Sequence, residues 1–167
     1  MATSELIRRI DGWLAANRPV YYTRLRPGVN ETSLLDFESR LGLKLPESFH
    51  ALYLWKDGQE ESCFESLHGN RMFMSLANII ETKQTLDGMI GTDFEEPSWW
   101  RRGWVPFLGN GGGDHLCLDL FAEDSGAAGQ LIAFWHEDPD RPIEFPNLDA
   151  WLLQLADSME GGNLEIL

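Results

Sequence analysis

Imidazole and carboxylate side chains gather at the ends of two apolar segments in the second half of the chain. Asp114, His115 and Asp119 belong to the first segment, and His136 directly follows the second. All four are metal-ligand types, so together they could form a metal site. However, the chain has no His-x-x-x-His pair and no paired Cys and His at ligand spacing. We read these residues as hydrogen-bonded groups at strand ends and expect neither a metal ion nor another cofactor.

Nucleophilic catalysis has little support in the sequence. Cys63 and His68 could form a thiol–imidazole pair, but no acidic residue is evidently placed to orient the imidazole. The Gly-x-Ser-x-Gly pattern of a hydrolase nucleophile is absent from the sequence. We therefore predict that the protein is not an enzyme. An unrecognised active site is the alternative, and a deep pocket with convergent titratable groups would support it.

Glycines dominate the run from Gly109 to Gly113, which joins two strand-like segments. A phosphate-binding loop would need Gly-Lys-Ser/Thr at the start of a helix, whereas Asp114 and His115 lead into a strand here. A dinucleotide fingerprint needs a following helix as well. The run is therefore interpreted as a structural turn, because glycine tolerates positive φ and close backbone approach.

The charge of the chain is acidic and unevenly distributed. The net charge of the 167 residues is −14; residues 1–44 carry a balance of +2, and residues 45–167 carry −16. Phosphate recognition depends on Lys and Arg, so we expect no nucleic-acid partner, and an anionic membrane would be repelled. A basic protein would be attracted to such a surface. The alternative is that the acidity serves solubility alone.

Candidate partner-binding residues fall in loops. Acidic clusters occur there, and they are either solvated loop ends or part of a surface that faces a partner. The tryptophan pair before Arg101 and Arg102 has the composition of a binding hot spot; alternatively, one Trp covers the core while the arginines balance Glu95 and Glu96. The candidates are Glu60, Glu61, Trp99, Trp100, Glu123, Asp124, Glu137, Asp138 and Asp140.

Cysteine usage and hydropathy predict a cytoplasmic protein. Cys63 and Cys117 are isolated from each other, as is typical of a reducing compartment. The N-terminal residues lack the apolar run of a signal peptide. No stretch approaches the roughly 20 apolar residues that span a bilayer. The length suggests a single domain over residues 1–167.

Hydrophobic periodicity predicts helices before strands. The helical segments begin with residues 4–17, where apolar side chains recur on one face. A second helix follows Asn30, a favourable N-cap, and ends at Gly42. Pro46 is expected at the first position of a third helix, which Asp57-Gly58 would stop. Weaker spacing, diluted by threonines, predicts a helix over 77–90, and strong spacing predicts another over 148–159.

Strands are expected between the last two helices. The candidates are 104–108, 115–120, 130–135 and a short edge strand at 143–145, with a hairpin over 63–76 that turns at Gly69-Asn70. Alternation within 115–120 places the leucines on one face and Cys117 on the other. Residues 18–29 read as a connector and 91–103 as a loop. The pattern predicts an α+β fold, with helices packed against a mixed or antiparallel sheet.

Several of these segments, in this order, resemble the SUKH superfamily, which holds the yeast Smi/Knr cell-wall regulators and many bacterial toxin-immunity proteins. ESRLGLKLPESF at 38–49 is similar to its helix–turn–helix signature, and DG at 57–58 follows in the expected place. WVPF at 104–107, NGGGD at 110–114 and LDL at 118–120 resemble its strand–loop–strand core. A closing helix followed by Gly161-Gly162 also fits, and the likeness covers about residues 3–165.

The resemblance implies a non-enzymatic binding protein with a SUKH-like fold. Its immunity branch would make the chain a protein that binds and neutralises a cognate toxin in the cytoplasm, with a basic nuclease as the toxin that best matches the acidic surface. The alternative is a regulatory scaffold that binds an endogenous protein, as the fungal relatives do.

Overall fold

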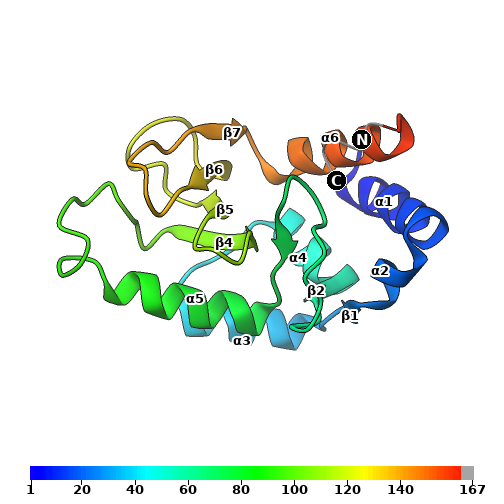
Figure 1. Ribbon diagram of the computed structural model, residues 1–167. Coiled ribbons are helices and arrows are strands. Elements are labelled where there is room, and N and C mark those ends of the chain that lie inside the picture. The colour runs from blue at the N-terminus through cyan, green and yellow to red at the C-terminus, as the bar shows by residue number, and fades with distance from the viewer. Residues whose placement is uncertain (163–167) are drawn as a thin grey trace.

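The computed structural model describes residues 1–162 and has an α+β fold (Figure 1). The predicted positions 163–165 at the end of the family likeness lie outside these residues. The helices are α1 (Thr3–Asn17), α2 (Pro19–Thr23), α3 (Glu31–Leu41), α4 (Glu47–Trp55), α5 (Leu76–Gly88) and α6 (Leu148–Glu160). The strands are β1 (Leu25–Pro27), β2 (Lys56–Gln59), β3 (Met72–Phe73), β4 (Trp104–Gly109), β5 (His115–Asp119), β6 (Gln130–Phe134) and β7 (Ile143–Phe145).

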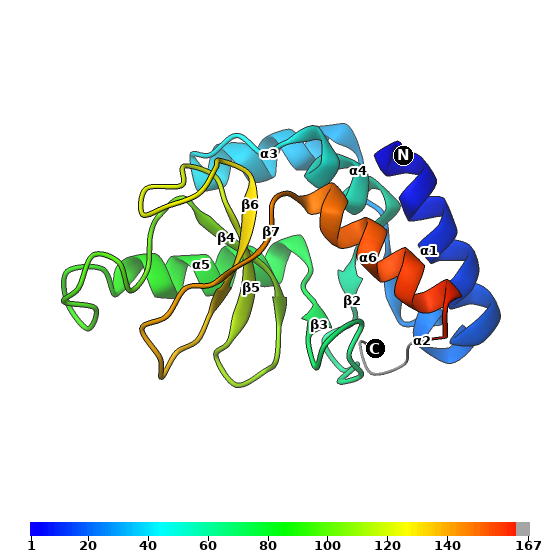
Figure 2. The same cartoon turned by 90° about the horizontal axis from the view of Figure 1, so that it is seen from above.

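The larger sheet is antiparallel, with the strand order β3-β4-β5-β6-β7. Helix α5 runs along one side of it beside α3, while α1 and α6 lie together at one end (Figures 1 and 2). Arg9 of α1 donates hydrogen bonds to Asp157 and Glu160 of α6, which ties the two ends of the chain together. The predicted edge position of 143–145 is confirmed, because β7 pairs with β6 at the end of the sheet.

Two apolar clusters cover the two faces of this sheet, as the alternation in β5 predicts. Leu116 and Leu118 join the main core, which also contains the buried faces of the helices. Cys117 packs on the opposite face with Trp100 and Phe134. The central strands are therefore buried on both sides, which explains why 131–134 is apolar throughout.

The helix ends follow the sequence signals closely. The side chain of Asn30 accepts from the Ser33 N–H at 2.8 Å, and Gly42 ends α3 with φ 66°. Pro46 occupies the N-cap of α4, one position before the predicted one. Its missing N–H costs nothing there, because the first turn has no intrahelical acceptor for it.

The N-terminal half differs from the prediction in three places. Residues 18–29 are not a plain connector: Pro19 starts the short helix α2, and β1 follows. The 56–59 segment is the strand β2, in which Asp57 and Gly58 lie, so they do not simply stop a helix. The hairpin over 63–76 is reduced to a turn at Gly69-Asn70 and the short strand β3, since its arms pair only next to the turn, between residues 67–68 and Arg71.

Hydrogen bonds of buried polar side chains hold strand β2 in position. Asp57 accepts from the Leu76 N–H at 2.8 Å, at the start of α5. The Gln59 side chain accepts from Tyr21 Oη at 2.7 Å and from the Phe73 N–H at 2.9 Å. Its amide group also donates to two carbonyls of the 60–67 loop, at 2.9 Å each. These contacts join α2, β2, β3 and the following loop, and they are long-range in sequence.

Candidate functional site

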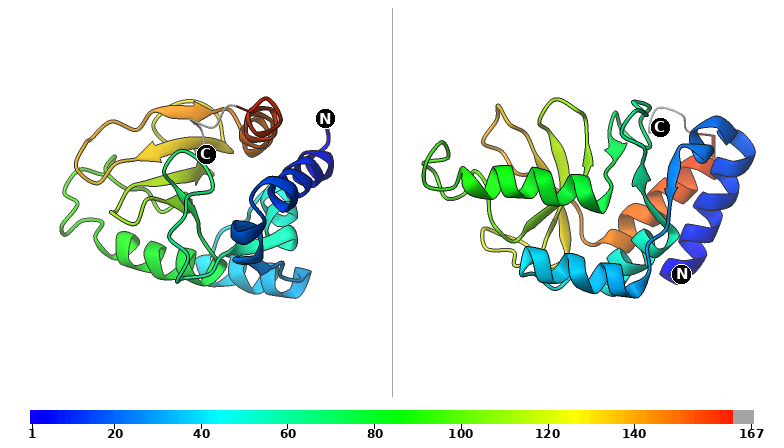
Figure 3. Two further views of the ribbon diagram at one scale, coloured as in Figure 1. Left: turned by 45° about the vertical axis from the view of Figure 1, so that its right-hand side comes forward. Right: turned by 90° about the horizontal axis from the view of Figure 1, so that it is seen from below.

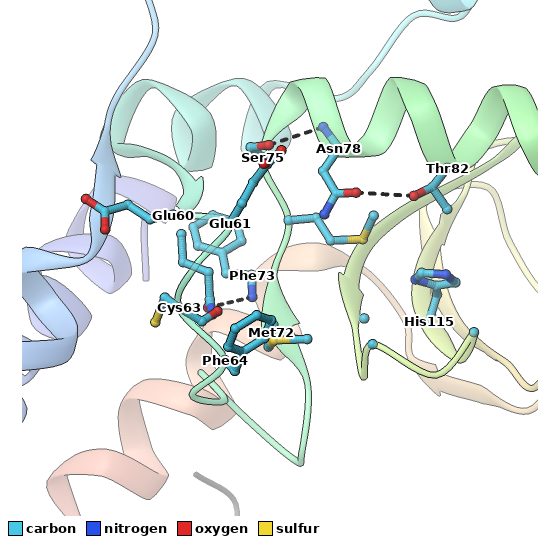
Figure 4. Close-up of a pocket in the computed structure, with 15 residues that line it drawn as sticks. Glu60, Glu61, Cys63, Phe64, Met72, Phe73, Ser75, Asn78, Thr82 and His115 are labelled. Atoms are coloured by element: carbon cyan, nitrogen blue, oxygen red, sulfur yellow. Dashed lines mark hydrogen bonds between the residues drawn. The ribbon is translucent and has the colours of Figure 1, made fainter.

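Three adjoining pockets form a depression that follows α5 and continues past its C-terminal end, here called the α5 groove. They have volumes of about 390, 520 and 420 Å³. The first two share Asn78, Thr82 and His115, and the second and third share Phe94 and His136. Figure 4 shows the first pocket between the 60–64 loop, β3 and α5, with His115 on its far wall. Figure 3 shows α5 from below, running past the glycine loop.

Helix α5 has two faces with different neighbours. Leu76, Ile79 and Lys83, spaced three and four residues apart, are buried. The groove face carries residues at the complementary positions, among them Thr82 and Thr85. The threonines that weaken the helical signal in the sequence thus face an open groove, where short side chains leave room. The groove-facing residues of α5 are Ser75 at its N-cap, Asn78, Glu81, Thr82, Thr85 and Leu86.

The glycine loop forms one wall of the groove. Asn110 Oδ1 accepts from the Gly112 N–H at 2.8 Å and from the Asp114 N–H at 3.1 Å. A side chain of the loop therefore binds two of the loop's own backbone N–H groups. Gly111 and Gly113 have φ values of 80° and 102°, which disfavour any side chain. A Cβ at Gly113 would also lie 3.2 Å from the His136 ring. The loop is therefore a structural turn with a defined outer surface.

The two histidines of the groove differ in environment. His115 is stacked near Phe134, and burial lowers its pKa to about 4. Its ring is therefore neutral at pH 7, and Nδ1 donates to the Leu108 carbonyl at 3.3 Å. Nε2 is then an acceptor. His136 instead contacts Asp114 at 2.7 Å through Nδ1, and its backbone N–H donates to the same carboxylate. Burial raises the pKa of Asp114, but these hydrogen bonds outweigh burial and lower it overall.

Carboxylates line the groove, and its two histidines are its only basic side chains among residues 1–162. Glu60, Glu61, Glu81, Asp93, Glu95 and Glu96 contribute to its walls. Over residues 1–162, no Lys or Arg lines any of the three pockets. Glu60 forms an ion pair with Arg24, and within the same residues the other five carboxylates have none. The floor is apolar, with Met72, Met74, Phe73, Leu86, Met89 and Phe134.

The predicted partner-binding residues fall in separate places. Glu60 and Glu61 line the first pocket, and the half-buried Trp99 lines the third. Glu123 and Asp124 lie on the β5–β6 loop, where both form ion pairs with Arg101. Arg101 therefore does not balance Glu95 or Glu96, contrary to one interpretation of the sequence. Glu137, Asp138 and Asp140 are exposed on the β6–β7 loop, outside the groove.

Trp100 does not fit the predicted role of an exposed anchor. Only 1% of it is exposed, and its ring packs edge-on against Trp104 and Phe134. Its Nε1 donates to Asp87 at 2.8 Å. Trp100 thus covers the smaller apolar cluster, which is the alternative that the sequence left open.

Several groove residues were missed at the level of sequence. The sequence predicts Phe64 in a strand of the hairpin, yet 79% of its surface is exposed beside the first pocket. The residue type and spacing of His115 suggest only a metal ligand. Asn78 and Thr82 carry no motif; the one signal was the low apolar content of that helix, which marks a face that does not enter the core.

Asp119 and His68, which the sequence offers for a metal site and a thiol–imidazole pair, each bind another side chain in the structure. Asp119 accepts from Gln130 at 2.9 Å at the end of β5 opposite to His115. His68 accepts from Trp151 Nε1 at 3.3 Å, and Cys63 is a buried free thiol. Across residues 1–162, no group of three or more His, Cys, Asp or Glu side chains could hold a metal ion.

The helices of residues 1–162 are too short or too polar for a bilayer, and none of them could span one.

Comparison with known proteins identifies relatives with longer chains. Residues 28–154 match the model of the SMI1 / KNR4 family (SUKH-1). The chain is similar to Cell wall assembly regulator SMI1 of Saccharomyces cerevisiae, with 28% identity over 102 residues, which cover 61% of this chain and 19% of that protein. F-box protein SKIP16 of Arabidopsis thaliana is 43% identical over 58 residues, 35% of this chain and 13% of its own. KNR4/SMI1 homolog 2 of Debaryomyces hansenii is 30% identical over 71 residues, which cover 42% of this chain and 12% of that protein. The chain spans less than a fifth of the length of each of these relatives.

Proposed function

Because the chain belongs to the SMI1/KNR4 family (SUKH-1), we propose that it is a non-enzymatic protein-binding domain whose partner is a basic protein. In its specific form, the proposal is that of an immunity protein, which binds a cognate toxin such as a basic nuclease and blocks its active site. The observation that carries the proposal is the acidic α5 groove, which is lined by carboxylates and, in residues 1–162, by no lysine or arginine.

Charge supplies the recognition in this mechanism. An acidic surface raises the rate at which a basic partner is encountered, and it competes with an anionic substrate for the same basic active site. An interface of about 1,600 Å² would be of standard size for such a complex. The two buried free thiols, Cys63 and Cys117, support a reducing compartment, and we place the complex in the cytoplasm.

Co-expression with a candidate toxin tests this function. A candidate toxin encoded by a neighbouring gene is induced in cells with and without the protein, and survival is counted. We expect the protein to restore growth. The proposal of immunity is rejected if the toxin kills equally well in its presence.

Charge reversal tests whether the β6–β7 loop contacts the partner protein. Glu137 and Asp138 are exposed there, so replacing both by Lys is expected to slow association at low salt if the loop faces the partner. The same double change at Glu5 and Glu47, two exposed carboxylates on α1 and α4 that are not candidate contacts, is the matched control. Unchanged association kinetics would remove Glu137 and Asp138 from the interface.

A regulatory scaffold is the second candidate. The similarity to Cell wall assembly regulator SMI1 favours it, as does the small share that the matched segment takes in each longer relative. In that case the chain would bind an endogenous protein and no toxin. Purification of the tagged chain from its own cells, followed by reconstitution with the recovered protein, separates the two. A direct complex with a housekeeping protein, together with failure of the survival assay, would establish the scaffold.

A further inference from the structure

We propose that the α5 groove binds an extended segment of the partner, about six residues long, in which lysine or arginine residues alternate with apolar ones. This inference rests on the proposed function, since it assigns a face of the molecule and a chemistry to the binding of a basic protein.

The length of the segment follows from the dimensions of α5. The helix has 13 residues, which correspond to about 20 Å at 1.5 Å per residue. An extended chain covers that distance with about six residues. The first two pockets share lining residues of α5, and the third continues past its C-terminal end at Met89. Alternate side chains of an extended segment lie about 7 Å apart on one side of the chain. One side of an extended segment could therefore place a side chain in each pocket.

The charge of the groove selects basic side chains. Glu61 and Glu81 on the first two pockets, and Asp93, Glu95 and Glu96 on the third, have no ion-pair partner among residues 1–162. Each end and the middle of the groove thus offer a carboxylate to an incoming cation. The floor suits the rest of the ligand, because Met72 and Met89 are adaptable apolar surfaces that can contact the methylene stems of Lys or Arg.

Hydrogen-bond acceptors at the centre of the groove also favour a donor-rich ligand. His115 stands where the first two pockets meet, and its Nδ1 is used by the Leu108 carbonyl. The neutral ring therefore offers the lone pair of Nε2, for which the described residues provide no donor. On the opposite wall, the Thr82 hydroxyl donates to Asn78 Oδ1 at 3.4 Å (Figure 4). An ammonium, a guanidinium or an extended backbone N–H would complete the His115 site.

An exposed aromatic residue marks the end of the groove. Phe64 lies on the first pocket between Glu61 and Glu65, and 79% of it is exposed. Large aromatic residues are common anchors in protein interfaces. An apolar residue at one end of the segment would cover Phe64 while its basic neighbours reach the carboxylates.

A short peptide of this composition tests the inference. Fluorescein-labelled Lys-Leu-Lys-Leu-Lys-Leu amide is titrated with the whole chain by anisotropy at about 0.05 M salt, where charge is least screened. Thr82→Trp fills the middle of the groove, and Gln84→Trp is the matched control on an exposed position of the same helix outside it. We expect Thr82→Trp to weaken binding by about tenfold or more, and Gln84→Trp to change it by less than about twofold.

A second pair of variants covers the case in which Thr82→Trp disturbs the fold. Glu81→Lys in the groove is expected to weaken peptide binding by about two- to fivefold, whereas Glu5→Lys on the exposed side of α1 leaves peptide binding unchanged. The sign-inverted peptide, with Glu in place of each Lys, is expected not to bind.

Each outcome decides the inference. Equal affinities for both members of each variant pair would overturn the groove as the site, while the proposed function would stand because a basic segment still binds. No binding by the wild-type chain would overturn the basic-segment inference. The survival assay judges the proposed function separately, since a toxin can be neutralised through another surface.

Discussion

Protonation of His68 is expected to destabilise the fold in mildly acidic solution. The residue is buried, with 7% exposed, and its Nδ1 accepts from Trp151 Nε1 at 3.3 Å. Burial, with a smaller contribution from the nearby charge of Arg71, lowers its pKa to about 4. The ordinary value in an unfolded chain is about 6.5, so the unfolded state takes up the proton first as the pH falls. Stability from this residue is complete above about pH 6.5 and is lost between 6.5 and 4.

The size of the effect follows from the shift of the pKa. A lowering from 6.5 to about 4 corresponds to about 3 kcal/mol of unfolding free energy at full protonation, and to about 2 kcal/mol at pH 5. Urea titrations followed by tryptophan fluorescence at pH 8 and pH 5 measure it. His68→Leu is expected to be less stable than wild type at pH 8, because Trp151 loses its acceptor, but to lose about 2 kcal/mol less on acidification.

A matched variant separates burial from hydrogen bonding. Trp151→Phe keeps an aromatic ring in the core but removes the N–H donor together with part of the indole ring, so it is expected to be less stable than wild type at both pH values. Since burial is the main cause of the shift, this variant should keep most of the wild-type loss between pH 8 and pH 5. His115, whose pKa is also about 4, adds its own loss in every variant and cancels in the comparison. The reasoning is refuted if His68→Leu and wild type lose the same stability on acidification.

Two further predictions concern stability. Gly42 and Gly58 have φ values of 66° and 67°, but a Cβ would meet nothing within 4 Å at Gly42 and would lie 2.4 Å from the Ser75 nitrogen at Gly58. In thermal or urea unfolding, Gly42→Ala should therefore lower the unfolding free energy by about 1 kcal/mol and Gly58→Ala by more than about 3 kcal/mol. Equal losses would contradict the close approach of the backbone at Gly58. Gln59→Leu leaves two donors and two carbonyls in the interior without their hydrogen-bond partner, so it should lower the unfolding free energy by about 3–5 kcal/mol. The exposed Gln154→Leu is the control and should lower it by less than about 0.5 kcal/mol. A loss below about 1 kcal/mol for Gln59→Leu would show that Gln59 does not hold the network together.

Local signals predicted the parts of the fold that depend on neighbours in sequence. Asn30 and Gly42 bound α3 as expected, because capping involves residues only three or four positions away. The alternation in β5 correctly assigned Leu116 and Cys117 to opposite faces, since side-chain direction in a strand is a local property.

The remaining parts depend on contacts between distant segments. Asp57-Gly58 has the composition of a stop signal, yet the segment becomes a strand because Gln59 pairs with Leu25 and binds Phe73. The α5 groove joins the 60–64 loop, a helix face and the glycine loop, which no local motif relates. Charge balance predicted the acidic character of the surface, whereas the position of the groove required the tertiary structure.

Mapping the peptide on the protein by amide chemical shifts tests the central claim most directly. Labelled protein is titrated with the lysine–leucine peptide at low salt, and shifts are followed residue by residue. The account predicts that the largest changes fall on Glu61, Thr82 and Gly113, with the 137–140 loop unaffected. Changes confined to the 137–140 loop, or no changes at saturating peptide, would contradict it.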